Sequence, residues 1–448
     1  MRVAVTKPLF AWDCLDDSPD LTTIRQVLAL LPDAELLEAL RRWRGKGRDD
    51  YQIHVLWGVV VLRTLLRHQS YESTLGELKR NPTLCRLIGI EDKSQIPRLY
   101  NLSRFLKVLG HKNHLALVTK AFDELIRRLG QVVPDLGQRT AGDSTGLSAR
   151  RLRKEGDDEC GLPEATGGKK EYLDDEGKVT RVVEWFGYKL HLLVDVRHEV
   201  ALAYAVTSAN AGDNELIPAL VKQAKGNLPE GRIETLAYDK AADTHEAHEY
   251  LHEEGISPVV EMRSLWKQEH HRPIPGHEGD NVVYDELGTV YCYDTTGEPA
   301  IQHKMAYIGH EKSRGTLKYR CPAMHEGWKC PRHEQCNAGK KYGKTLRVKQ
   351  EIDLRRFPPI PRATKQFERL YCGRTAVERI NGRVKMFWGA DDGNVTGAER
   401  FHANVGVVML VHAALATLLA AAPRREGTLG KMRLSPIAQA LRERSGLG

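Results

Sequence analysis

Residues 139–261 carry the pattern that most constrains how this chain can fold. Two runs rich in Val, Leu, Tyr and Trp, Arg181–Val196 and Glu199–Thr207, are separated by two residues and predict a β-hairpin. A further strand is predicted at Arg139–Thr145. Helix and strand patterns then alternate, as helix Glu215–Lys225, strand Ile233–Tyr238, helix Asp243–Glu254 and strand Ile256–Glu261. This order predicts an α/β fold, in which a mixed sheet carries helices on its faces.

The regions on either side of this pattern differ in kind. The first 135 residues lack long alternating runs and predict a helical N-terminal domain over 1–135. Residues 136–263 form the first part of the α/β core, and short strand patterns separated by Gly, Pro and His predict a β-rich insertion at 264–366. Helical patterns return at 367–422, the second part of the core, and a basic tail follows at 423–448. A length of 448 residues is ample for these regions.

The charge balance permits a polyanionic partner without requiring one. Lys and Arg number 67 against 59 Asp and Glu, which gives a formal net charge of +8. Basic residues gather at 41–48, at 150–154 and in the tail, so the net charge understates how positive individual surfaces are. The eight cysteines are mostly scattered and no secretory signal precedes them, which favours a reducing cytosol.

One apolar stretch needs to be compared with a membrane span. Val405–Ala422 contains His412 and Thr417 as its clearly polar residues, and its length is near the lower limit for crossing a bilayer. The stretch is rich in Ala, lacks aromatic belts and follows Arg400 and His402 without a break. A helix buried in a large core is therefore the preferred interpretation, and we expect no membrane partner.

Two segments of the N-terminal region suit contact with DNA. The segment 41–48 places five cations around Trp43, including Arg41, Arg42 and Arg44. Residues 94–105 predict a helix that presents basic side chains, namely Arg98, Arg104 and Lys107. A solvated loop explains the first segment and ordinary helix packing explains the second, so both alternatives stay open.

Two aspartates stand where sheet strands place metal ligands. Asp143 lies on the first predicted strand, and Asp239 directly follows the apolar strand that ends at Tyr238. Each alone is equally compatible with a helix cap or loop residue. A third carboxylate, Glu378, belongs to a stripe with Tyr371, Arg374 and Lys385 that spans an arc of about 60° on an α-helix.

The stripe by itself fits a solvated helix face with an ion pair between Arg374 and Glu378. Together with the two aspartates, it provides the oxygen ligands that Mg²⁺ prefers. Two such ions about 3.5–4 Å apart activate a water or hydroxyl and stabilise the leaving oxygen. The three carboxylates and the adjacent cations therefore predict a site that cuts phosphodiesters.

At these residues the sequence resembles the DDE-type transposases of bacterial insertion sequences. The match is to the branch with the signature Tyr-x2-Arg-x3-Glu-x6-Lys, which Tyr371, Arg374, Glu378 and Lys385 complete. The pattern Gly187-Tyr188-Lys189-x-His191, the phrase Tyr238-Asp239-Lys240-Ala241-Ala242-Asp243 and the long β-rich insertion are also similar to this branch. A departure is the long, charged segment 150–170 after the first Asp, where we expect a loop.

The resemblance implies a ribonuclease H-like core and a DNA transposition reaction. The enzyme would hydrolyse the ends of an insertion sequence and join the freed 3′-hydroxyl to target DNA. Asp143, Asp239 and Glu378 would bind two Mg²⁺ ions. Residues near the cleavage point would contact phosphates or a flipped base, namely Tyr371, Arg374, Lys385, Lys189 and, by stacking, Trp266.

The same resemblance implies the partners and the setting of the enzyme. It would bind double-stranded DNA at terminal inverted repeats and at the target, as a homodimer on paired ends, in the cytoplasm of a prokaryotic cell beside the nucleoid. Two alternatives remain: a stand-alone nuclease on the same core, and a DNA-binding protein derived from a transposase but without catalysis.

A cysteine cluster in the insertion suggests a second metal. Cys321, Cys330, His333 and Cys336 lie within sixteen residues and offer the four ligands that tetrahedral zinc uses. The first gap is irregular for a common zinc finger. Free thiols in a reduced protein are the alternative.

Overall fold

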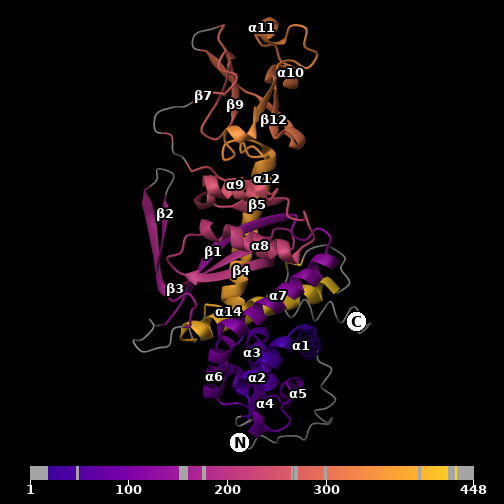
Figure 1. The fold of residues 1–448 in the computed structure, drawn as a ribbon, viewed down its shortest axis with the longest axis vertical. Coiled ribbons are helices and arrows are strands. Elements are labelled where there is room, and N and C mark those ends of the chain that lie inside the picture. Colours follow the sequence, from indigo (N-terminus) through magenta and orange to yellow (C-terminus); the bar gives the residue numbers. More distant parts are fainter. Residues whose placement is uncertain are drawn as a thin grey trace, which may run out of the picture.

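The computed structural model describes residues 19–46, 50–150, 160–173, 178–263, 266, 271–296, 300–391, 395–421 and 429–430. The molecule is elongated, with three regions stacked along its long axis (Figure 1). N-terminal helices lie at one end, a twisted sheet flanked by helices lies in the middle, and a β-rich insertion lies at the other end. The α/β fold class predicted from the sequence, with its helical N-terminal region and β-rich insertion, is confirmed.

The N-terminal region is helical throughout its described secondary structure. Its helices are α1 Pro19–Leu30, α2 Ala34–Arg44, α3 Ile53–Leu65, α4 Tyr71–Arg80, α5 Pro82–Leu87, α6 Leu99–Leu109 and α7 Lys112–Val132. Local capping starts α4, because the backbone N–H of Ser73 donates to Ser70 Oγ at 3.1 Å. α3 is buried along almost its whole length and forms the centre of this region.

The central sheet has six strands. They are β1 Arg139–Ser148, β2 Thr166–Leu173, β3 Val179–Asp195, β4 Val200–Ser208, β5 Thr235–Tyr238 and β6 Ser257–Val260. β4, β3, β1, β5 and β6 lie side by side in that order, and β2 pairs with the first half of β3. β1 is antiparallel to β3 and parallel to β5, which is itself parallel to β6. This is the mixed sheet that the sequence order predicts.

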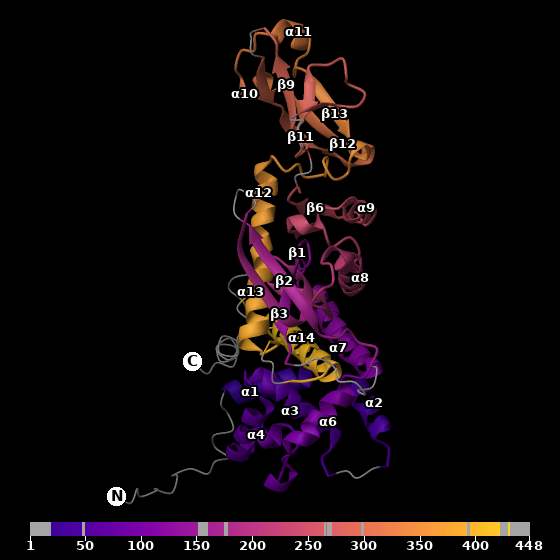
Figure 2. The same cartoon turned by 90° about the vertical axis from the view of Figure 1, so that its left-hand side faces the viewer.

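Helices cover both faces of the sheet, as Figure 2 shows. α8 Ile217–Asn227 packs on β3 and β4, and α9 His245–Glu253 packs on β6. On the other face, α12 Lys365–Tyr371 packs on β5 and β6, while α13 Thr375–Gly382 packs on β1 and β3. The chain therefore returns from the insertion onto the sheet face opposite α8 and α9.

The long apolar helix near the C-terminus joins the sheet to the N-terminal helices. α14 Ala398–Ala421 packs against α1, α3, α6 and α7 and against β4. Within the described residues it is the one helix with the length and hydropathy of a membrane span, and 78% of its most apolar window is buried inside the protein. Its buried His412 accepts a hydrogen bond from the backbone N–H of Ala201 at 2.9 Å. It is the core helix that its composition predicts.

In its described residues, the insertion contains two small sheets and two short α-helices. The first sheet consists of β7 Arg272–Pro273, β8 Val282–Tyr284, β9 Val290–Asp294 and β10 Ile301–Lys304, and the second of β11 Ala306–Glu311, β12 Thr316–Arg320 and β13 Thr345–Lys349. α10 Pro322–Glu326 and α11 His333–Asn337 follow β12. Short 3-10 turns link elements along the chain, namely η2 Lys93–Gln95, η3 Asn214–Leu216, η4 Lys240–Ala242, η5 Lys312–Arg314, η6 Gln350–Ile352 and η7 Cys372–Arg374.

One sequence expectation about the central sheet is wrong. We expected a loop over 150–170, but β2 begins at Thr166 and forms an antiparallel ladder with β3. Gly167, Gly168, Lys169 and Lys170 are poor strand formers, and their pairing depends on the length of β3, which projects beyond β1 and supplies a partner.

Candidate active site

The register of β1 and β5 sets the positions of the two aspartates, since Asp143 lies within β1 and Asp239 directly follows β5. Ala141 on β1 pairs with Ala237 on β5, so Asp143 and Asp239 stand two residues beyond the same register position. Gly142 makes room for the buried side chain of Tyr238, the residue before Asp239. A Cβ at Gly142 would lie 2.1 Å from Cε2 of the Tyr238 ring, so no larger residue fits beside that ring.

Asp143 is buried, and its surroundings disfavour the ionised carboxylate. Burial raises its pKa to about 6, and the nearby Asp239 adds to this rise. The backbone N–H of Ser144, which donates to Asp143 Oδ1 at 2.8 Å, and the cations of Lys170 and Arg374 oppose it. A positive charge brought beside this pair of carboxylates would therefore favour the ionised form.

Asp239 occupies the first position of a tight turn. Its Oδ1 accepts a hydrogen bond at 3.0 Å from the backbone N–H of Ala241, which caps η4. The capping role and the metal-ligand role weighed from the sequence are compatible, because the other carboxylate oxygen is not used in that bond.

The segment that carries Glu378 is not the uniform α-helix that the 100° spacing assumed. Tyr371 ends α12, Arg374 ends the 3-10 turn η7, Glu378 lies on α13, and Lys385 lies in a π-helical turn, η8 Arg383–Phe387. At η7 the backbone approaches the sheet closely, since a Cβ at Gly373 would lie 2.7 Å from Val196 Cγ1. Tertiary contacts therefore accompany the interruptions of the regular α-helix. Helical turns of the π type are frequent at functional sites.

Despite these interruptions, the signature residues face the sheet. Arg374 bridges two carboxylates: Nη1 donates to Asp143 Oδ2 at 3.4 Å and Nη2 donates to Glu378 Oε1 at 2.9 Å. Lys385 Nζ donates to the carbonyl oxygen of Gly146 on β1 at 2.7 Å. The predicted pair of Arg374 and Glu378 is present, and Arg374 connects it to the first aspartate.

Arg374 thus links Asp143 to Glu378, and Asp239 lies near enough to Asp143 to influence its pKa, but the three carboxylates do not form a closed ligand set. Across the described ranges, no group of three or more His, Cys, Asp or Glu side chains is placed to hold a metal ion. The Glu378 side chain is 55% exposed and is held toward Asp143 through Arg374. The donor set consists of carboxylate oxygens, which suits a hard divalent cation.

A protein-family model for the transposase DDE domain matches residues 137–414, which is more than half of the chain. This chain belongs to the DDE transposase family. Among solved structures, a cryo-EM structure of the piggyBac transposase synaptic complex with hairpin DNA is similar, with 12% sequence identity and a TM-score of 0.34, over 97% of this chain and 83% of that chain. No curated protein sequence matches this transposase.

The Gly187-Tyr188-Lys189-x-His191 pattern of the transposase lies on β3 and is largely internal. A Cβ at Gly187 would lie 2.0 Å from the carbonyl oxygen of Leu147, so this position needs glycine. Lys189 Nζ donates to Asp213 Oδ1 at 3.0 Å and to the carbonyl oxygen of Ala211 at 2.8 Å. In this structure Lys189 fastens the loop after β4, and its contact with phosphate stays a prediction.

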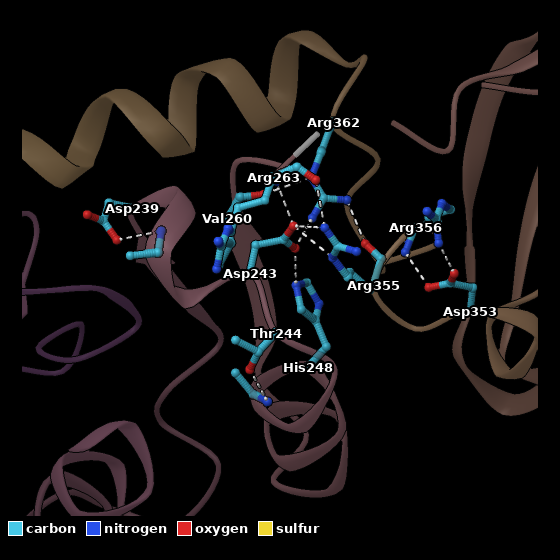
Figure 3. A network of polar contacts seen from close by, with 12 residues as sticks. Asp239, Asp243, Thr244, His248, Val260, Arg263, Asp353, Arg355, Arg356 and Arg362 are labelled. Carbon is cyan, nitrogen blue, oxygen red and sulfur yellow. Dashed lines mark hydrogen bonds and ion pairs between the residues drawn. The ribbon is translucent and has the colours of Figure 1, made fainter. Parts of the chain in front are cut away.

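A buried carboxylate that the sequence did not single out lies four residues after Asp239 (Figure 3). Asp243 accepts hydrogen bonds from Arg355 Nε at 2.7 Å, Arg362 Nη2 at 3.2 Å and the backbone N–H of Arg263 at 2.8 Å. Asp243 Oδ1 also forms a hydrogen bond with His248 Nε2 at 3.1 Å. Burial opposes ionisation, but the bonds from His248, Arg355 and the Arg263 backbone, together with the charge of Arg362, lower the pKa of Asp243.

This network corrects the predicted start of the helix after Asp239. We expected Asp243 to begin that helix, but Thr244 caps α9 by accepting from the backbone N–H of Ala247 at 3.2 Å. Asp243 instead joins the sheet to both ends of the insertion, because Arg263 precedes the insertion strands and Arg355 and Arg362 follow them. The sequence motif 238–243 contains both Asp239 and Asp243, and it is the signal that could have identified Asp243.

Trp266 lies at the start of the insertion and packs inside it. Its ring contacts Tyr284 at a centroid distance of 6.0 Å, and the guanidinium carbons of Arg272 and Arg356 lie 4.2 and 5.0 Å from its centroid. Stacking on a flipped base stays a prediction.

The basic N-terminal segments of the transposase meet at one groove. Arg41, Arg42 and Arg44 lie on the last turns of α2. A groove of about 450 Å³ is lined by Trp43 and Arg44 together with Tyr100 and Arg104 from α6. Trp43 is 55% exposed and Tyr100 is 52% exposed. The structure therefore brings together the two segments that the sequence selected separately. Most of the predicted basic tail, 423–448, lies outside the described residues.

Three of the four predicted zinc ligands line one pocket. Cys321, Cys330 and Cys336 line it, and Cys292 from β9 supplies the fourth thiol there. His333 is not among the lining residues, and its Nδ1 lies 3.5 Å from Asn337 Nδ2. Cys292 is distant in sequence from the other three and carried no spacing signal.

Proposed function

We propose that this transposase cleaves the ends of an insertion sequence and joins the freed 3′-hydroxyl to target DNA, using Asp143, Asp239 and Glu378. The observation that supports the proposal is the link that Arg374 makes between Glu378 and Asp143, which lies on the strand beside β5, the strand that leads directly into Asp239. Oxygen ligands so arranged suit phosphoryl transfer assisted by divalent metal ions.

Two Mg²⁺ ions are the proposed cofactors. The buried Asp143 fits a cation, because burial and, to a smaller extent, Asp239 disfavour its ionised form, and a bound cation would favour that form. When bound, the ions would activate the attacking water or 3′-hydroxyl and stabilise the leaving oxygen. For Glu378 to act as a ligand, Arg374 must exchange its carboxylate partners for another anion, and a DNA phosphate is such an anion.

The other signature residues are suited to hold that phosphate. Arg374 offers a planar fork of donors. Burial, together with the nearby Glu261, raises the pKa of Tyr371 to about 12, so its hydroxyl stays protonated and able to donate a hydrogen bond. Lys385 adds a cation near Gly146 on β1. We expect these three residues to orient the scissile phosphate against the carboxylates.

The groove between α2 and α6 is the proposed contact with double-stranded DNA. It combines cations with the exposed rings of Trp43 and Tyr100, which suits phosphate contact and stacking. Terminal inverted repeats are the proposed ligand there, with a second copy of the protein on the paired end. The proposed setting is the prokaryotic cytoplasm.

The test is a cleavage and strand-transfer assay with the DNA that flanks the gene, in Mg²⁺ and in EDTA. Glu378→Gln should reduce both steps by about 10³-fold or more, since a lost metal ligand removes several kcal/mol of transition-state stabilisation. Binding of the same DNA should change little. The matched control is Glu368→Gln, which alters an exposed glutamate on the preceding helix and should keep both activities.

The outcomes separate the alternatives. Cleavage that never yields a joined product would indicate a nuclease, and DNA binding without cleavage would indicate a protein that has lost catalysis. Cleavage retained by Glu378→Gln would mean that another residue supplies the third carboxylate.

A further inference from the structure

The insertion places four cysteines around one small pocket. Cys292 comes from β9, Cys321 immediately precedes α10, Cys330 lies between the two short helices, and Cys336 lies on α11. All four line a cavity of about 20 Å³. None of them forms a disulfide.

The thiols are close enough to influence one another. Burial raises the pKa of Cys292 to about 12, and Cys321, Cys330 and Cys336 each add to that rise. Burial also raises the pKa of Cys330, with contributions from Cys321 and Cys336. This agrees with their positions, since all four cysteines line the same pocket.

Burial disfavours negatively charged sulfur here, and Asn337, Arg332 and Lys344 are placed to offset that cost. Asn337 Nδ2 donates to Cys321 Sγ at 3.5 Å, a contact of the kind that orients and stabilises metal-bound thiolates. Arg332 and Lys344 also line the pocket and bring positive charge toward it. Backbone turns set the cysteines in place, since His325 N–H donates to the carbonyl oxygen of Cys321 and His333 N–H donates to that of Cys330.

The polypeptide around the pocket has little else to hold it. α10 and α11 have five residues each, which is too short for a helix to be stable on its own. The apolar cluster of the insertion contains ten buried side chains, and apart from Met305 near the pocket it lies with the sheets and with Phe357. Small folded units with so little core commonly use a metal or disulfides as a staple.

We propose that Cys292, Cys321, Cys330 and Cys336 bind one structural Zn²⁺ ion that ties α10 and α11 to β9. Each thiol would lose its proton as a sulfur–zinc bond forms, with no change in oxidation state. Across the described ranges, no three His, Cys, Asp or Glu side chains are already placed to hold a metal ion, so the sulfurs must close in on the ion when it binds. Cys292 takes the place that spacing alone assigned to His333.

The first measurement is the zinc content of the purified full chain, produced with zinc in the medium. We expect about one equivalent per chain, because a closed four-thiolate site binds zinc tightly. Cys292→Ser should lose most of it. The controls are His333→Ala and Cys372→Ser, an exposed cysteine outside the cluster, and both should retain the metal.

Cobalt binding to the wild-type chain tests the ligands without relying on a variant that fails to fold. Co²⁺ added to the zinc-free protein should give the charge-transfer absorption of four thiolates in tetrahedral geometry, and added Zn²⁺ should displace it. Less than about half an equivalent of zinc in the wild type would overturn the proposal. Zinc retained by Cys292→Ser and lost by His333→Ala would overturn the ligand assignment, and a disulfide among the four cysteines in the freshly purified chain would exclude it.

Discussion

The central sheet and the β-rich insertion of this transposase differ in how much apolar surface each buries. One continuous cluster of buried apolar side chains runs from α1 through the sheet to α14, so the N-terminal helices and the sheet share a core. The insertion has a separate cluster of ten buried side chains around Phe357. Hydrophobic burial is the main source of stability, and among the described residues the insertion and the sheet belong to separate apolar clusters. Apolar packing therefore joins the N-terminal helices to the sheet but does not join the insertion to it.

The insertion is joined to the sheet through a buried polar network instead. Asp243 on the sheet side meets Arg355 and Arg362, whose side chains are 10% and 5% exposed. The same turn carries Asp239 at its start and Asp243 just after its end. We infer that the network that attaches the insertion also holds Asp239, the second proposed metal ligand, in position.

The largest expected effect comes from breaking this junction. Asp243→Ala leaves two buried guanidinium groups without their carboxylate and should lower the free energy of unfolding by about 3–5 kcal/mol. Urea unfolding monitored by circular dichroism measures it. Glu351→Ala, which removes an exposed ion pair with Lys349 in the insertion, should cost about 1 kcal/mol or less. Equal small losses in both variants would mean that the junction is not what holds the insertion.

A smaller change, an increase in the free energy of unfolding, is expected from a substitution of Asp143 in the sheet. Burial raises the pKa of Asp143 from 3.8 to about 6, so its ionised form destabilises the metal-free protein. This cost begins above pH 4 and is complete above pH 6. Asp143→Asn should therefore stabilise the protein in EDTA by about 1–3 kcal/mol at pH 8, and by little at pH 4.

Thermal unfolding at the two pH values checks this prediction, with Asp20→Asn, an exposed carboxylate of α1, as the control. Asp143→Asn should also be inactive in the cleavage and strand-transfer assay. A gain of equal size at pH 4 and pH 8 would show that the stabilisation does not come from ionisation of Asp143.

The smallest expected effect is on DNA binding, and one substitution at each end of the molecule tests it. Arg42→Gln removes an exposed cation from α2 and should weaken DNA binding a few-fold and reduce the slope of log affinity against log salt by about one. Arg314→Gln removes an exposed cation from the insertion and should change neither. Fluorescence anisotropy at several salt concentrations measures both. A lower slope for Arg314→Gln would place DNA on the insertion as well.

Much of the fold was predictable because it depends on short-range patterns. Period-two and period-3.6 spacing located β1, β3, β4, β5 and β6 and the helices between them. β2 was missed because its sequence is a poor strand and its ladder depends on the projecting half of β3. The π-turn that carries Lys385 was also missed, since regular helical spacing contains no sign of the contacts that distort it.

The sequence by itself determined the chemistry of the site, because residue type and order along the chain specify Asp143, Asp239 and Glu378 as candidate oxygen ligands and Arg374 and Lys385 as their cations. Only the tertiary structure decided which groups meet. Asp243 and Arg355 are 112 positions apart, and Cys292 joins its three partners by way of a strand in another part of the insertion. Such contacts depend on how elements pack, and no local period in the sequence records them.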